Sequence, residues 1–157
     1  MVVVEVVEQA ARWPEEAEDW ARRAVEAAFA VAPEAPPEDA EVSILLADDA
    51  AVQELNRAWR GKDGPTNVLS FPAPAQPGVQ GPLRLGDIAL ALETLEREAG
   101  SEGKSLADHL LHLVVHGTLH LLGHDHEDEA EAKAMEALEV AALARLNVAD
   151  PYRDMAA

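Results

Sequence analysis

The chain has 157 residues, of which 48% are hydrophobic, and it contains 10 Pro, 9 Gly and no Cys. That length fits one domain, and the lack of Cys excludes disulfide scaffolds, thiolate zinc fingers and cysteine catalysis. The formal net charge is −18, which argues against broad contact with nucleic acid, yet residues 55–86 carry four basic side chains and one acidic one.

Nine elements are predicted from apolar periodicity, β-branched runs and capping residues. In chain order we expect a strand at 2–7, a helix from 14 to about 31, a strand at 41–47, a helix ending at 59, strands at 66–71 and 85–90, a short helix to about 99, and helices at 106–122 and 127–146. Asp48 or Asp49 can cap the second helix, Gly61 can end it, and Ser105 can cap the long one. Residues 72–82 are expected to form a loop.

This order, βαβαββααα, predicts an α+β fold in which about five helices pack on a four-stranded mixed sheet. We expect one domain over residues 1–157, because no repeat or linker divides the chain. The strand order does not follow from the sequence. The chain has no basic start typical of a signal peptide and no run of ~20 apolar residues, so we expect a soluble cytoplasmic protein.

All six histidines lie between positions 109 and 126, and they are the strongest functional signal in the sequence. Within a helix, His116 and His120 share one face, ~6 Å apart along the axis, which is the spacing of a chelating pair in many zinc sites. His124 would lie ~12 Å from His116 on an uninterrupted helix, which is too far for both to bind one metal ion.

Gly123 indicates how the chain could supply a third ligand. A glycine permits the left-handed residue that ends a helix, so the chain can turn back and bring His126 toward the pair. We therefore predict His116, His120 and His126 as metal ligands, with His124 either behind the ligands or facing substrate. The two remaining histidines, His109 and His112, are expected to be structural, with a supporting role at the site as the alternative.

Three neutral imidazoles leave a fourth metal position open, which is typical of catalytic rather than structural sites. The predicted cofactor is one Zn²⁺ per chain, with nickel or another divalent ion as the alternative. The spacing matches the H-E-x-x-H-x-x-G-x-x-H pattern of metzincin proteases, but Gly117 stands where those enzymes have their general-base Glu. A peptidase is therefore disfavoured, unless a carboxylate from elsewhere takes that role.

The second informative segment is residues 55–71, which contains most of the locally basic stretch. Arg60 and Lys62 fall at the end of the predicted helix and in the turn after it. Arg binds phosphate through two parallel hydrogen bonds, so Arg60 near a metal site could hold a substrate phosphate for hydrolysis. The alternative is that both side chains only balance the C-terminal dipole of the helix.

Two long motifs resemble one known family. Residues 116–126, HGTLHLLGHDH, look like the signature of the YbeY family of bacterial rRNA maturation factors and endoribonucleases, and residues 56–72 resemble its other hallmark. Residues 86–88 and the acidic last helix around 135–136 also fit. The resemblance covers nearly the whole chain and is strongest over residues 55–126. The family commonly has Tyr where this chain has His124, while the three predicted ligand positions match.

The resemblance implies a small metalloprotein with a three-His zinc site that cleaves single-stranded RNA in 16S rRNA 3′-end maturation and ribosome quality control. Arg60 would match the functional arginine of the family in a positively charged cavity. Lys62 and His124 are predicted to contact substrate, and His124 and Asp125 are candidate general bases. The expected partners are single-stranded RNA, above all rRNA, and the small ribosomal subunit with its proteins, with no DNA and no membrane.

The sequence thus predicts a metal-dependent endoribonuclease, a hydrolase acting on phosphodiester bonds. We expect products with 5′-phosphate and 3′-hydroxyl ends, and the alternative is attack by the RNA 2′-hydroxyl, which leaves a cyclic phosphate. Two alternatives stay open. One is a metalloprotease-like hydrolase. The other is a ribosome assembly factor without catalytic activity, in which the metal is structural and the acidic surface binds basic ribosomal proteins, as the charge of −18 would favour.

Overall fold

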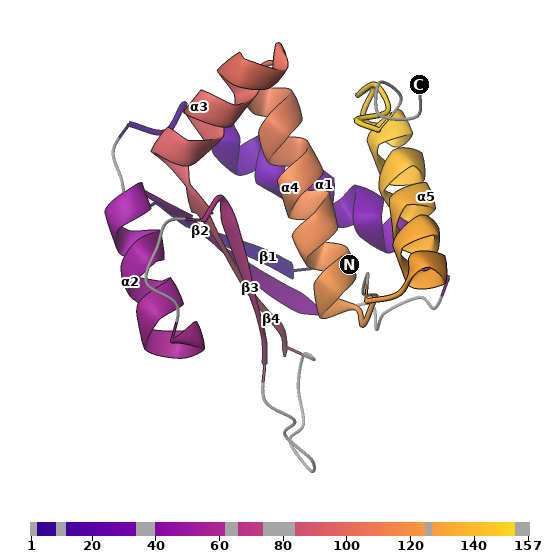
Figure 1. Cartoon of the computed structure of the whole chain (residues 1–157), viewed down its shortest axis with the longest axis horizontal. Coiled ribbons are helices and arrows are strands. Elements are labelled where there is room, and N and C mark those ends of the chain that lie inside the picture. The colour runs from indigo at the N-terminus through magenta and orange to yellow at the C-terminus, as the bar shows by residue number, and fades with distance from the viewer. Residues whose placement is uncertain are drawn as a thin grey trace.

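The computed structural model describes residues 3–8, 12–33, 40–61, 66–73, 84–124 and 127–152. Their strands are β1 (Val3–Glu8), β2 (Glu41–Ala47), β3 (Val68–Pro72) and β4 (Arg84–Ala91). Their helices are α1 (Ala17–Val31), α2 (Asp49–Arg60), α3 (Leu92–Glu102), α4 (Leu106–Leu121) and α5 (Glu129–Arg145). The predicted α+β fold with five helices and a mixed four-stranded sheet is confirmed (Figure 1).

The sheet has the strand order β1-β2-β4-β3. β2 pairs in parallel with β1 and β4, and β3 pairs antiparallel with β4. β1 and β3 are therefore the two edge strands. Side chains alternate across the sheet, so Ile44 and Leu46 of β2 belong to one apolar cluster while Leu45 and Ala47 belong to another.

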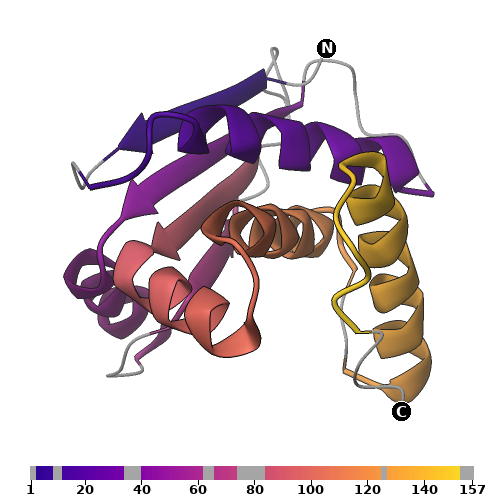
Figure 2. The ribbon, with the colours of Figure 1, turned by 90° about the horizontal axis from the view of Figure 1, so that it is seen from above.

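The two clusters place the helices on opposite faces of the sheet. α1 and α4 pack against the face that carries Ile44 and Leu46, and α2 covers the other face. α5 packs against α1 and α4. Figure 2 shows α4 between the sheet and α5. The histidine-bearing helix is therefore held from both sides, by β-strands on one and by α5 on the other.

The predicted caps form. The Asp48 side chain accepts a hydrogen bond from the Ala51 amide at 2.8 Å, and Gly61 ends α2 with a φ of 66°. Ser105 Oγ accepts from the Asp108 amide at 3.1 Å and caps α4. These local bonds satisfy the helix-end groups that have no partner within the helix.

Some boundaries differ from the prediction. α1 begins at Ala17 rather than near Pro14, because the proline carbonyl accepts the Ala17 amide in a turn that precedes the helix. α5 begins at Glu129, after Asp128 caps it through a bond from the Glu131 amide. β3 runs to Pro72, a residue that edge strands tolerate. Most of the predicted 72–82 loop lies outside the described residues. None of the described helices is long and apolar enough to cross a membrane.

Candidate metal centre

The two central histidines of α4 face each other as the helical spacing predicts. His120 Nε2 lies 3.1 Å from His116 Nε2, and the ring centroids are 4.6 Å apart with planes 77° to one another. Both side chains are half-buried. Two imidazole nitrogens therefore converge on one point beside the last turn of the helix.

The chain turns back directly after this pair. Gly123 has a φ of 97°, and its amide donates to the His120 carbonyl at 3.0 Å. The His124 amide donates to the Leu119 carbonyl at 3.0 Å. This pair of bonds is the Schellman arrangement that ends helices at a left-handed glycine. The predicted helix stop at Gly123 is confirmed.

Several predicted site residues lie where the structure gives no side chain. His126, Asp125 and Lys62 fall outside the described residues, and of Arg60 only the backbone at the end of α2 is described. Among the residues that are described, no three His, Asp or Glu side chains form a group that could hold a metal ion. The third ligand, the phosphate-binding arginine and the substrate role of Lys62 therefore stay predictions.

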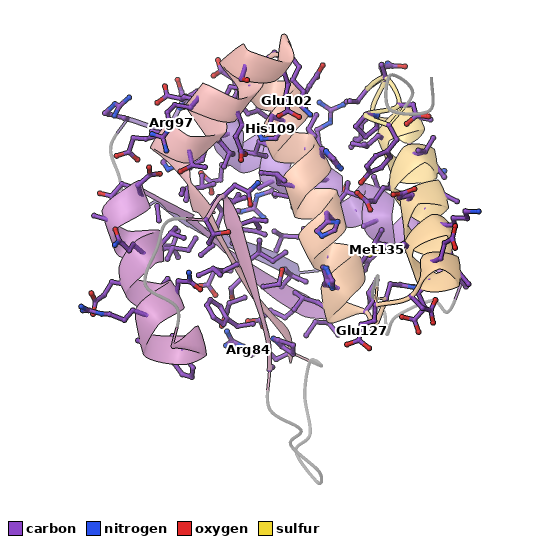
Figure 3. The ribbon with its side chains drawn as sticks, in the orientation of Figure 1. Arg84, Arg97, Glu102, His109, Glu127 and Met135 are labelled. Carbon is purple, nitrogen blue, oxygen red and sulfur yellow. The ribbon has the colours of Figure 1, made fainter. Side chains whose placement is uncertain are left out.

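A carboxylate from α5 reaches one histidine of this pair, His116. Glu139 is 1% exposed, and it lies one turn after Met135, which Figure 3 shows between α5 and α4. Its Oε2 is 3.3 Å from His116 Nδ1. Its Oε1 is 2.8 Å from His112 Nε2 and accepts a hydrogen bond from the Tyr152 hydroxyl at 2.7 Å. One buried carboxylate thus joins α4, α5 and the segment after α5.

Glu139 is ionised in this environment. Burial raises the pKa of its carboxyl, but hydrogen bonds from His112, His116 and Tyr152 outweigh burial and lower the pKa to about 2. The shift at Tyr152 has the opposite sign. Burial, and then the hydrogen bond to the carboxylate, raise the pKa of the phenol well above its usual range. The hydroxyl therefore stays protonated and donates a hydrogen bond to Glu139.

The carboxylate decides which nitrogen of His116 is available to a metal. An ionised carboxylate only accepts hydrogen bonds, so the His116 proton is on Nδ1, facing Glu139, and the lone pair is on Nε2. Two nitrogens that bind one Zn²⁺ at ~2.0–2.1 Å in tetrahedral geometry lie ~3.3 Å apart. The 3.1 Å between His116 Nε2 and His120 Nε2 fits two ligands of one divalent ion.

The other two histidines of α4 differ from each other. His109 is buried, and its Nε2 lies 2.8 Å from Glu98 Oε1, which also accepts from Asn67 Nδ2 at 3.0 Å. Figure 3 shows His109 at the end of α4 near α3, with Glu102 nearby. His112 instead shares Glu139 with His116. His112 therefore lies where it could support the metal site, which the sequence analysis above gave as the alternative to a structural role.

Gly117 faces the sheet and not the histidine pair. A Cβ at this position would lie 2.9 Å from Ser70 Oγ and 3.2 Å from Ile88 Cδ1. α4 therefore approaches β3 and β4 closely at this residue. A glutamate at position 117 would be directed into this contact, so the site lacks both the general base of a metzincin and the space for it.

On the opposite face of β3 lies an exposed aromatic surface. Trp59, near the end of α2, is 73% exposed, and its ring centroid lies 6.0 Å from that of Phe71 on β3. Phe71 packs with the cluster under α2, whereas Ser70, next to it in the strand, contacts α4 at Gly117. The edge strand β3 thus lies between the Trp59 ring and the histidine helix.

Comparison with known proteins decides the family. The family model described as endoribonuclease YbeY matches residues 4–147. The chain belongs to the endoribonuclease YbeY family. An endoribonuclease YbeY from Parvibaculum lavamentivorans is 50% identical over 95% of this chain and 84% of its own length. Another, from Sphingopyxis alaskensis, is 54% identical over 92% of this chain and 94% of its own length.

A solved structure shows the same fold. The solution structure of TM1509 from Thermotoga maritima superposes with a TM-score of 0.57 at 23% identity, and the match covers 94% of this chain and 92% of that one. The resemblance to the YbeY family that the two motifs indicate is confirmed. Membership in a family of endoribonucleases, together with the close packing at Gly117, speaks against the metalloprotease alternative.

Glu139 is a site residue that the sequence motifs did not indicate. A signal for it was present. The buried face of α5 includes Met135, Ala142 and Leu143, so Glu139 occupies an apolar position of the helix at spacings of three and four residues. A charged residue at such a position needs buried partners, and six histidines were available to supply them.

Proposed function

We propose that this YbeY-family chain is an endoribonuclease that hydrolyses phosphodiester bonds in single-stranded RNA at a metal site on α4. The observation that carries the proposal is the pair of facing nitrogens on His116 and His120, 3.1 Å apart, with the buried Glu139 carboxylate 3.3 Å from His116 Nδ1. The printed names of the relatives, endoribonuclease YbeY, support the reaction class.

Each of the predicted site residues would have a separate role in cleavage. His116, His120 and His126 would hold one Zn²⁺, with nickel as the alternative. A bound divalent ion supplies Lewis-acid polarisation of a phosphoryl oxygen and lowers the pKa of water toward ~7. Arg60 would hold the scissile phosphate and stabilise the charge that develops on its oxygens. Lys62 and His124 would contact the RNA substrate.

The products of cleavage distinguish the two ways of breaking the RNA backbone. Attack by water on phosphorus leaves a 5′-phosphate and a 3′-hydroxyl, whereas attack by the RNA 2′-hydroxyl leaves a cyclic phosphate. We expect the first outcome. Mass spectrometry of the fragments measures it, and cyclic-phosphate ends would contradict direct hydrolysis.

The proposed partners follow from the substrate. We propose rRNA as the main substrate, the small ribosomal subunit and its proteins as the setting, and the cytoplasm as the location. A net charge of −18 disfavours broad contact with nucleic acid, and the locally basic stretch at residues 55–86 is the part of the sequence whose charge suits RNA. The same charge suits basic ribosomal proteins, so an assembly role could accompany cleavage.

Arg60→Ala should lower the rate of RNA cleavage by about 10²–10³-fold, the usual cost of losing one donor to a developing oxyanion. Metal content and melting temperature should stay close to those of the wild type. Single-turnover cleavage, metal analysis and thermal unfolding of the same preparation measure the three quantities. Loss of the metal or of the fold in Arg60→Ala would mean that Arg60 is structural.

The Trp59 ring supports a single-stranded substrate. Unpaired bases stack on exposed aromatic rings, and each stack contributes ~1–3 kcal/mol. Trp59 lies next to Arg60 in the sequence, and its side chain is 73% exposed although its ring contacts Phe71. We propose that one RNA base stacks there while the neighbouring backbone reaches the histidine site.

Trp59→Ala should therefore raise KM for a single-stranded oligonucleotide about 5-fold to 100-fold and change kcat little. Trp59→Phe, which keeps a ring, should restore most of the loss. The matched control is Val7→Ala on β1, because Val7 is the other large apolar residue that is exposed among those described, and β1 is the opposite edge strand. Equal KM values for wild type and Trp59→Ala would contradict stacking at this ring.

A further inference from the structure

Glu139 sits where an isolated charge would be costly. It is 1% exposed, and its neighbours on the buried face of α5 are apolar. Burying a carboxylate is unfavourable unless hydrogen bonds replace the lost water. Glu139 has three such partners, and each has a proton to give: the ring N–H groups of His112 and His116 and the hydroxyl of Tyr152.

The two oxygens of the carboxylate have separate tasks. Oε1 receives His112 Nε2 at 2.8 Å and the Tyr152 hydroxyl at 2.7 Å, and these two partners are themselves 3.2 Å apart. Their rings meet edge to face at 5.6 Å. Oε2 lies toward His116 Nδ1 at 3.3 Å. His112 and Tyr152 thus fix the rotation of the carboxylate, which leaves its second oxygen directed at His116.

We propose that Glu139 is a positioning residue for the metal site, and that His112 and Tyr152 hold it in place. By accepting the His116 Nδ1 proton, the carboxylate holds the ring in the tautomer and orientation that present Nε2 to a metal ion. It also makes that nitrogen a stronger donor to the metal. Carboxylate partners of metal-ligating histidines act in this way in other proteins, and their loss weakens metal affinity by about 10–100-fold.

The role extends to the segment after α5. Tyr152 lies in a turn in which its amide donates to Asp150 Oδ1 at 2.8 Å. This turn places the phenol over Glu139. The contacts that orient His116 therefore begin beyond the last helix. This inference rests on the metal site of the proposed function.

The alternative is that the hydrogen bonds of Glu139 only stabilise the packing of α5 against α4. A second carboxylate–imidazole pair on the same helix provides the matched control, since Glu98 Oε1 lies 2.8 Å from His109 Nε2 and also joins two helices. In Glu139→Gln an amide replaces the carboxylate that accepts from three donors. The amide has one oxygen and an NH₂ group, so it cannot accept hydrogen bonds from all three. Glu98→Gln makes the same change at a pair that does not contact His116.

The test measures the zinc affinity of the full-length variants by competition with a chelator. Urea unfolding of the same variants without metal measures their stability. We expect zinc Kd to rise by about 10–100-fold in Glu139→Gln and to stay at the wild-type value in Glu98→Gln. Tyr152→Phe should weaken zinc binding in the same direction by a smaller factor. It also carries the test if Glu139→Gln does not fold. An unchanged Kd in folded Glu139→Gln and in Tyr152→Phe would overturn the proposal.

A second readout needs no metal and no activity. Nitrogen NMR of the imidazoles should show His116 protonated at Nδ1 in the wild type and a mixture of tautomers in Glu139→Gln. Wild type protonated at Nε2 would overturn the positioning role. If wild type binds no zinc, the proposed metal site itself fails, and this inference fails with it. If wild type and Glu98→Gln bind zinc while Glu139→Gln binds it equally well, only the positioning role is wrong.

Discussion

His120→Ala should lose most of its affinity for zinc and, with it, the RNA cleavage activity. His120 and His116 present the two nitrogens that converge within 3.1 Å, so removal of one imidazole leaves half of the placed ligand pair. Structural zinc sites bind with ~10–16 kcal/mol over four ligands, so one ligand corresponds to roughly 3 kcal/mol, or at least about 10²-fold in Kd. Metal analysis of the purified variant and a chelator competition measure the loss.

His124→Ala is the matched control for this prediction. His124 lies just after the helix stop, with its amide bonded to the Leu119 carbonyl, and we do not assign it as a ligand. It should keep zinc at the wild-type affinity. A loss of zinc in His124→Ala that equals the loss in His120→Ala would show that the ligand set is wrong.

Gly86→Ala should destabilise the fold by about 3 kcal/mol or more. Gly86 has a φ of 151°, a backbone conformation that side chains disfavour. An added Cβ would lie 2.2 Å from the Phe71 carbonyl oxygen and 2.9 Å from Leu121 Cδ2. Because the first of these is a backbone atom, β3 would have to move away from β4. Urea unfolding should show a clearly lower midpoint.

Gly100→Ala should have the opposite effect and stabilise the fold. Gly100 lies within α3, and a Cβ there would meet no atom within 4 Å. Alanine is a better helix former than glycine, so the free energy of unfolding should rise by about 0.5–1 kcal/mol. If Gly86→Ala unfolds at the same urea concentration as Gly100→Ala, β3 and β4 do not approach each other closely at Gly86.

Local signals predicted the local parts of this molecule. Asp48, Gly61 and Ser105 act as the caps that their residue types indicate, and Gly123 ends the histidine helix with a left-handed residue. The facing of His116 and His120 also follows from helical spacing alone. In each of these cases the interacting groups lie within a few positions of one another in the chain.

Contacts between distant residues could not be derived in the same way. The placement of β4 between β2 and β3 depends on packing of the whole sheet, which the sequence pattern of one strand does not encode. Glu139 reaches His116 only because α5 packs against α4, and Tyr152 adds a partner from beyond α5. The predicted structural role of His112 overlooked this shared carboxylate for the same reason.

The most direct test is cleavage of end-labelled single-stranded RNA by zinc-loaded wild type beside identically purified His116→Ala. We predict that the wild type cuts the RNA, that a chelator stops it and that added zinc restores it, while His116→Ala remains inactive at every zinc concentration. Equal cleavage by the two proteins would mean that the activity does not come from the histidine site. No cleavage by the zinc-loaded wild type, on free RNA or on small ribosomal subunits, would contradict the proposed function and favour an assembly factor with a structural metal.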